Sequence, residues 1–151
     1  MARKVLLDSG PLGEITHPRA ERRRPIREWL FRLLEAGTYP RLAEIVDYEH
    51  RRKLLHLESV GGVNRLDEFK RVFGYEPLTT GVMLRAASLW ADARMKGMPT
   101  APERSLDIDV ILAAQALELT EEDEPVVVAT TNPRHLSRFV DARIWQEIEP
   151  S

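Results

Sequence analysis

Two apolar runs have the pattern of buried strands. Residues 5–7 are Val-Leu-Leu and stop at Asp-Ser-Gly-Pro in residues 8–11, which predicts a strand followed by a turn. Residues 125–129 are Pro-Val-Val-Val-Ala, a β-branched run without polar alternation, as is typical of a central parallel strand covered on both faces. Shorter strands are predicted over residues 75–79 and near residues 143–148.

Elsewhere, apolar residues recur at helical spacing. Helices are predicted over five segments: 25–37, about 43–57, 63–73, about 81–96 and 108–119. Pro25 suits a first helical turn, Gly61 and Gly62 separate the second helix from the third, and Thr80 is a candidate N-cap. The alternation of strands and helices predicts one three-layer α/β/α domain with a mainly parallel sheet over residues 1–151.

The composition narrows the possible function classes. The 151 residues are 43% hydrophobic and 30% charged, as in one soluble domain, and the formal net charge of -2 gives no global basic field for nucleic acid. Because the chain has no Cys, disulfides, thiolate metal sites and cysteine nucleophiles are excluded, and a reducing cytoplasm is expected. No apolar run approaches the roughly 20 residues of a membrane span, so no membrane association is expected.

Polar residues follow the two clearest strands. Asp8 comes after the first and Asn132 after the valine-rich strand, so both are expected at the same crevice beyond the carboxyl ends of the sheet. Two helices can add acids there, Glu49 from one and Asp107 with Asp109 from another. Converging carboxylates raise one another's pKa unless a cation compensates them, and oxygen ligands favour Mg²⁺ or Mn²⁺. The pattern therefore indicates a metal site suited to phosphodiester cleavage.

Arginines near these acids can hold a nucleic acid by its phosphates. Arg51 and Arg52 follow Glu49, and Arg134 follows Asn132, so these three are candidate RNA-binding residues. The segment 19–32 holds six further arginines, which form either the solvated side of a helix or a strip that binds RNA or a partner. The four histidines, His17, His50, His56 and His135, have no metal-ligand spacing.

Four segments together resemble the motifs of the PIN-domain family, and especially those of VapC-like toxins. In order, they are residues 5–12, 44–54, 107–116 and 126–136. The resemblance implies a metal-dependent ribonuclease in which Asp8, Glu49 and Asp109 bind Mg²⁺ or Mn²⁺. Asn132 and Asp107 would complete the site, although Asn132 replaces a more acidic residue and Leu136 replaces a Phe.

The resemblance also implies biological context. Hydrolysis by such enzymes leaves a 5′-phosphate and a 3′-hydroxyl. The relatives are often homodimers, and the leading role is the toxin of a toxin–antitoxin pair, with a cognate antitoxin as partner.

Other interpretations remain open. Asp8 and Asn132 are also suited to be turn residues. A solvated or capping role is open for Glu49, Glu44 and Asp47, and either Asp107 or Asp109 is suited to be the N-cap of its helix. A non-catalytic RNA-binding or regulatory PIN-like domain is the first functional alternative, and a phosphotransfer enzyme or receiver with Asp8 as acceptor is the second. Trp29, Trp90 and Trp145 are expected to be core or interface anchors.

Overall fold

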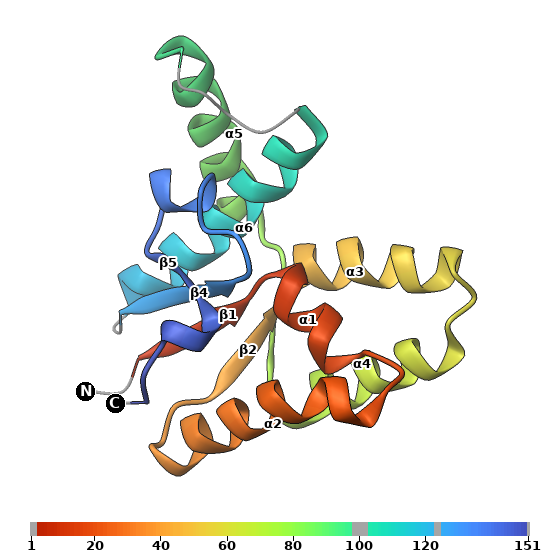
Figure 1. Ribbon diagram of the computed structural model, residues 1–151. Coiled ribbons are helices and arrows are strands. Elements are labelled where there is room, and N and C mark those ends of the chain that lie inside the picture. The colour runs from red at the N-terminus through yellow and green to blue at the C-terminus, as the bar shows by residue number, and fades with distance from the viewer. Residues whose placement is uncertain (1–2, 98–102, 123–124, 151) are drawn as a thin grey trace.

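The computed structural model describes residues 3–97, 103–122 and 125–150. Its elements, labelled in Figure 1 where there is room, are β1 (Lys4–Leu7), α1 (Ser9–Ile15), α2 (Ala20–Glu35), β2 (Pro40–Ala43), α3 (Glu44–His56), α4 (Val60–Phe73), β3 (Tyr75–Glu76), α5 (Thr80–Met95), α6 (Glu103–Glu122), β4 (Val126–Thr130), η1 (Leu136–Arg138), β5 (Ala142–Ile144) and η2 (Trp145–Glu147). None of the helices in these described ranges is long and apolar enough to cross a membrane.

All five strands are parallel and form one sheet in the order β3-β2-β1-β4-β5. Helices α1 to α4 lie on one side of the sheet, and α5 and α6 lie on the other (Figure 1). The prediction of a three-layer α/β/α fold is therefore confirmed. In the centre, Leu7 at the end of β1 pairs with Ala129 near the end of β4, so the segments after both strands leave the sheet at the same edge.

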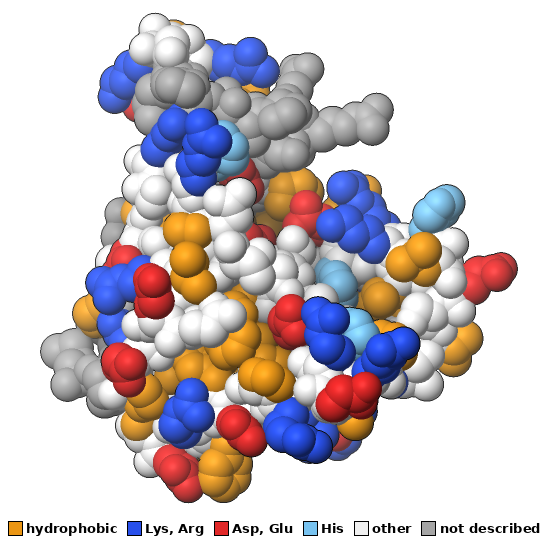
Figure 2. Space-filling view, viewed as in Figure 1, with side chains coloured by type: hydrophobic (Ala, Val, Ile, Leu, Met, Phe, Trp, Pro, Cys, Tyr) orange, Lys and Arg blue, Asp and Glu red, His pale blue; other side chains and the backbone are white. Residues whose placement is uncertain are grey.

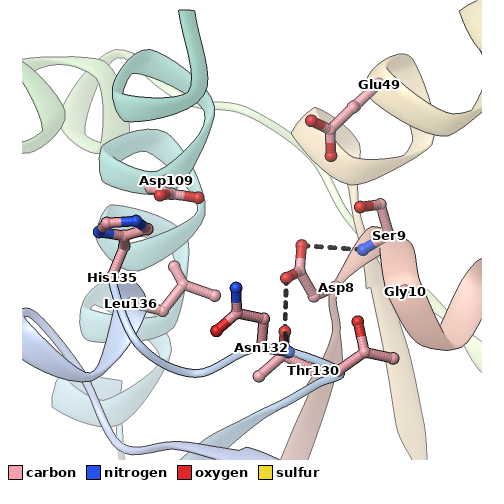
Figure 3. Close-up of a pocket in the computed structure, with 10 residues that line it drawn as sticks. Asp8, Ser9, Gly10, Glu49, Asp109, Thr130, Asn132, His135 and Leu136 are labelled. Carbon is pink, nitrogen blue, oxygen red and sulfur yellow. Dashed lines mark hydrogen bonds between the residues drawn. The ribbon is translucent and has the colours of Figure 1, made fainter. Parts of the chain in front are cut away.

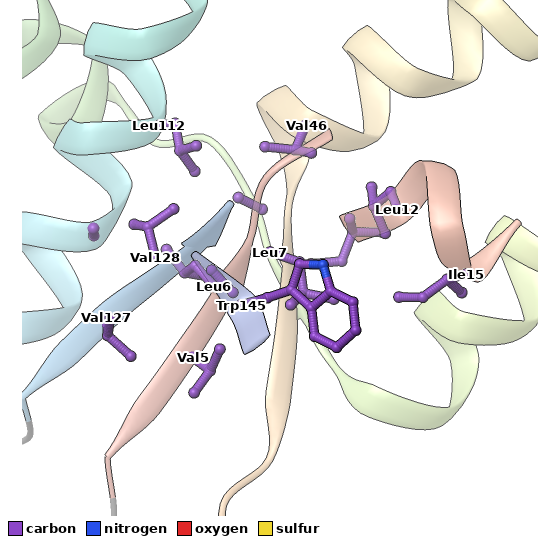
Figure 4. Close-up of a cluster of buried hydrophobic side chains, with 14 of the residues drawn as sticks. Val5, Leu6, Leu7, Leu12, Ile15, Val46, Leu112, Val127, Val128 and Trp145 are labelled. Carbon is purple, nitrogen blue, oxygen red and sulfur yellow. The ribbon is translucent and has the colours of Figure 1, made fainter. Parts of the chain in front are cut away.

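The core forms where the apolar strands meet the helices. Every residue of β4 is buried, as the unbroken valine run predicts, and Figure 4 shows side chains of β1 and β4 packed with those of α1 and α6. A second apolar cluster lies between α5 and α6, and Leu78 and Ile111 pack against both clusters. The rings of Trp29 and Trp145 lie 5.3 Å apart in the core, which confirms the expectation for these two residues.

The predicted turn after β1 is wrong, because helix α1 begins there at Ser9. Asp8 is the N-cap of this helix and accepts a hydrogen bond from the Ser9 amide at 2.8 Å. Pro11 lies in the first turn, where an amide hydrogen would have no partner within the helix. The residues that suggested a turn are therefore those that begin a helix.

Several other boundaries differ from the sequence prediction. Helix α2 begins at Ala20, so Pro25 lies inside it and not in its first turn. Strand β2 was not predicted. The break before α4 lies at Glu58, which has a positive φ of 54°, and Ser59 caps the helix, so Gly61 and Gly62 belong to its first turn.

Two helices on the other side of the sheet also begin earlier than predicted. The N-cap of α5 is Thr79, whose hydroxyl accepts from the Val82 amide at 3.1 Å, and not Thr80. Helix α6 begins at Glu103, so neither Asp107 nor Asp109 is its N-cap. Both aspartates instead lie inside the helix, where residues two apart project from different faces.

Candidate active site

A pocket of about 340 Å³ opens at the carboxyl ends of β1 and β4. The structure brings Asp8, Glu49, Asp109 and Asn132 together around it, as Figure 3 shows. The other lining residues are Ser9, Gly10, Thr130, Thr131, His135 and Leu136. In Figure 2, acidic side chains occupy a hollow between α3 and α6, with Lys and Arg side chains on the surface to either side.

Asp8 is held from two sides. One carboxylate oxygen accepts from the Ser9 amide and the other accepts from the Thr130 hydroxyl, each at 2.8 Å. The hydroxyl oxygen of Thr130 in turn accepts a hydrogen bond from the Asn132 amide at 3.1 Å. The Thr130 side chain is buried. Thr130 thus fixes the carboxylate of Asp8 and the loop of Asn132 relative to each other. Asp8 therefore caps α1 and lines the pocket at the same time.

Thr130→Val is expected to lower activity at this pocket. The substitution removes the hydroxyl that donates to Asp8 and accepts from the Asn132 amide, leaving a buried charge-assisted hydrogen bond unmade, which costs about 1.5–3 kcal/mol. If the pocket catalyses the RNA cleavage expected from the sequence, we expect a loss of about tenfold or more in kcat/KM. Thr120→Val is the matched control, because the Thr120 hydroxyl only donates to the Ala116 carbonyl of α6. Equal rates for the two variants would contradict the role given to Thr130.

Gln115 links the two helices that carry Glu49 and Asp109. It lies on α6 and only 2% of it is exposed. Its Oε1 accepts from the Ile45 amide in the first turn of α3 at 3.4 Å, and its Nε2 donates to the Glu76 carbonyl of β3 at 2.8 Å. The separation of α3 and α6 is therefore fixed by a buried amide one helical turn from Glu49.

His50 holds α3 on its other side. Its Nε2 lies 2.8 Å from the Thr16 hydroxyl, which donates to the Leu12 carbonyl of α1. Burial lowers the pKa of His50, so the ring is neutral at pH 7. Because His50 directly follows Glu49, this contact fixes the part of α3 that faces Asp8.

The carboxylates of the pocket act on one another electrostatically. Burial, and then the negative charges of Asp8 and Glu49, raise the pKa of Asp109 from 3.8 to about 7. The three groups come from the end of β1, from α3 and from α6, so only the tertiary fold brings their charges within range. A divalent cation would remove this repulsion, since its charge stabilises all three ionised forms.

The donor set fits a hard divalent cation. Among the described residues, no three His, Asp or Glu side chains already form a tight ion-binding group. Mg²⁺ does not require one, because it usually binds through one or two carboxylates and keeps several waters. The carboxylates of Asp8, Glu49 and Asp109 and the amide oxygen of Asn132 supply oxygen ligands of the kind that Mg²⁺ and Mn²⁺ prefer.

Asp107 does not join this group, in contrast to the expectation from the sequence. Its exposed side chain lines a separate apolar cleft between α5 and α6, beside Trp90 and Val110. Asp107 and Asp109 are two residues apart, and such residues lie on different faces of a helix. Only one of the two aspartates can therefore face the pocket.

The candidate RNA-binding arginines do not line the pocket either. Arg51 forms ion pairs of 2.7 Å with the buried Asp47 and with Asp67, which raise its pKa and commit it to the packing of α3 on α4. Asp47 is therefore neither solvated nor a cap. Arg52 lies over the ring of Tyr48, at 5.0 Å from its centre, and Arg134 is exposed beside the pocket loop.

The arginines of α2 are also remote from the pocket. None of residues 19–32 lines it. Arg23 and Arg27 instead border a groove between α2 and α4, whose floor includes Leu30 and Phe69. The arginine run thus belongs to the outer surface of α2 and to this groove.

His135 lines the pocket although it was not predicted there, because the spacing of the four histidines suggests no metal site. It reaches the pocket because it follows β4 on the same loop as Asn132. Asn132 itself retains a turn role, since its Oδ1 accepts from the Arg134 amide at 3.3 Å. Position after a central strand was the signal that could have identified both residues.

Comparison with known proteins gives a consistent structural result. No family model and no curated sequence matches the chain. Solved structures do match. VapBC2 from Rickettsia felis bound to a promoter DNA fragment has a TM-score of 0.68 and 12% identity, over 93% of this chain and 97% of that chain. VapBC-1 from nontypeable Haemophilus influenzae has a TM-score of 0.69 and 15% identity, over 95% and 99% of the two chains, and DNA-bound VapBC from Salmonella typhimurium has a TM-score of 0.63 and 19% identity, over 95% and 98%.

The similarity extends over nearly the whole length of both chains in each case, while the identity stays below 20%. At such identities the match establishes architecture and not chemistry. VapC is the PIN-domain toxin of such complexes. The chain therefore has the fold of a VapC-like PIN domain.

Proposed function

We propose that this protein is an Mg²⁺- or Mn²⁺-dependent endoribonuclease. The observation that supports this most directly is that Asp8, Glu49 and Asp109 line one pocket, where burial and the charges of Asp8 and Glu49 raise the pKa of Asp109 to about 7. A protein that keeps three carboxylates on one solvent-accessible pocket destabilises itself unless a cation binds there. The likeness to VapBC structures supports the choice of RNA as the substrate class.

Each residue of the proposed site has a role. Asp8, Glu49 and Asp109 would hold the cation, and Asn132 adds a neutral oxygen, a donor set that favours one ion over two. When bound, the ion would supply positive charge that stabilises the reacting phosphate and favours ionisation of water. Thr130 and the Ser9 amide orient Asp8. Water attack at phosphorus then breaks the bond to O3′ and leaves a 5′-phosphate and a 3′-hydroxyl.

We also propose that the protein acts in the cytoplasm as the toxin of a two-component pair, in which a cognate antitoxin blocks cleavage. The matched structures are VapBC complexes, which supports such a partner. The groove between α2 and α4 offers a binding surface, because its apolar floor is bordered by Arg23, Arg27 and Arg65 and by Phe31, which is 62% exposed.

A homodimer is a further proposal, testable by light scattering.

The proposed activity predicts cleavage that depends on the cation. The purified protein is incubated with a single-stranded RNA oligonucleotide in Mg²⁺, Mn²⁺ or EDTA. We expect cutting with either ion, none in EDTA, recovery when excess Mn²⁺ is added back, and products with a 5′-phosphate. RNA binding without cleavage in either ion would favour the non-catalytic RNA-binding alternative. If the protein neither binds nor cleaves the RNA, the ribonuclease proposal is overturned.

A further inference from the structure

We propose that His135 is a substrate-binding residue, which donates a hydrogen bond from Nε2 to a phosphate oxygen of the RNA backbone. The inference rests on the proposed ribonuclease function. It assigns the phosphate contact inside the pocket to a residue that neither the carboxylate pattern nor the candidate arginines include.

The position of His135 is fixed by the short helix that follows it. Leu136 is 2% exposed and belongs to the main core cluster, so it anchors the loop against the protein. The Ser137 amide donates to the Pro133 carbonyl at 2.9 Å, which closes the turn on which His135 lies. In Figure 3 the His135 ring lies on the α6 side of the pocket, near Asp109. The backbone that carries His135 is therefore fixed before a ligand binds.

The surroundings of the ring favour one tautomer. Nδ1 of His135 is buried and has no hydrogen-bond partner among the described residues. A buried N–H without an acceptor is costly and rare in proteins, so the proton belongs on the other nitrogen. With its proton on Nε2, the ring offers an N–H donor to the pocket that His135 lines.

The charge of the pocket gives this donor its partner. The residues described as lining it include three carboxylates and neither Lys nor Arg. A phosphate in the pocket therefore needs neutral donors besides the cation, because carboxylates only repel it. A hydrogen bond from a neutral N–H to an anionic phosphate oxygen is charge-assisted and stronger than one between neutral groups.

The proposed contact is a hydrogen bond to a phosphate oxygen, and no proton is transferred along it. This contact is available both before and during bond cleavage, and an interaction of that kind affects KM more than kcat. This distinction gives the inference its own measurable signature.

The test compares His135→Ala, which removes the donor, with His135→Gln, which keeps an N–H donor at a similar distance from the backbone. Steady-state cleavage of a single-stranded RNA oligonucleotide in Mn²⁺ gives KM and kcat, and thermal unfolding reports folding. We expect His135→Ala to raise KM about tenfold with kcat within about twofold, and His135→Gln to recover most of the loss. His56→Ala is the matched control, because His56 is exposed at the end of α3, outside the pocket.

Binding is measured separately in the Asp109→Asn background, where cleavage is expected to be slow. There, adding His135→Ala is expected to raise the Kd for the same oligonucleotide about tenfold. Unchanged KM and Kd in a folded His135→Ala protein would overturn the inference. So would a fall in kcat alone, or equal losses in folded His135→Ala and His135→Gln. If the unaltered protein neither binds nor cleaves RNA, the proposed function fails and the inference fails with it.

Discussion

Asp109→Asn is expected to slow metal-dependent RNA cleavage by at least about a hundredfold, whereas Asp107→Asn is expected to leave the rate within about twofold. Asp109 lies among the carboxylates of the pocket, and its replacement would remove one charged ligand from the proposed cation. Asp107 lies on the same helix two residues earlier, with an exposed side chain on another face. The rates are measured on one RNA oligonucleotide at saturating Mn²⁺.

This pair of variants is a sharp test because the two changes are chemically identical. A contaminating nuclease would show the same activity in both preparations, so a difference between them belongs to the protein itself. Asp109 is also a better choice than Asp8, which caps α1 and therefore contributes to folding as well. Equal activity in Asp109→Asn and Asp107→Asn would contradict the placement of the catalytic site in this pocket.

Asp109→Asn is expected to stabilise the protein when no divalent cation is bound. In the folded state the pKa of Asp109 is about 7, whereas an unfolded chain has the ordinary value of 3.8. Well below pH 3.8 the group is protonated in both states, so it lowers the free energy of unfolding by nothing there. As pH rises from about 4 through 7, the unfolded state loses its proton first, so stability falls, and the loss is complete above pH 7. Because Asp109 is only partly buried, we expect a gain of about 1–3 kcal/mol at pH 8.

Chemical denaturation in EDTA at pH 4 and at pH 8 measures this effect. The free energy of unfolding of Asp109→Asn is expected to exceed that of the unaltered protein clearly at pH 8, with a difference close to zero at pH 4. Addition of Mn²⁺ at pH 8 should raise the thermal midpoint of the unaltered protein more than that of the variant. A gain of the same size at both pH values would show that the charge of Asp109 is not its cause, and Asp107→Asn serves again as the control.

The fold could be predicted where burial alone determines the residue pattern. Strand β4 has an unbroken apolar run from Val126 to Ala129 because both of its faces are covered. Strand β2 was missed because it is four residues long, begins with Pro40 and contains Arg41, whose side chain forms an ion pair with Glu76 of the neighbouring strand β3. Such a strand is identifiable only from its partners.

The candidate site could be predicted only as far as strand ends and helices could be placed. Asp8 and Asn132 follow central strands, so a parallel sheet brings them to one edge whatever the loops do. The expected role of Asp107 depended on the start of α6, and the structure begins that helix at Glu103. The ion pairs of Arg51 with Asp47 and Asp67 depend on how α3 meets α4, which no local pattern reports.

The order of the strands has a consequence for the time at which activity can appear during synthesis. Strand β1 is translated first, whereas its neighbour β4 is among the last elements to be translated. Thr130 is the last residue of β4, and Asn132 follows that strand. A growing chain on the ribosome therefore contains Asp8, Glu49 and Asp109 without the strand and hydroxyl that hold Asp8 in place. The pocket cannot form until β4 has been translated, so the proposed ribonuclease activity is expected to be absent from a nascent chain that lacks β4.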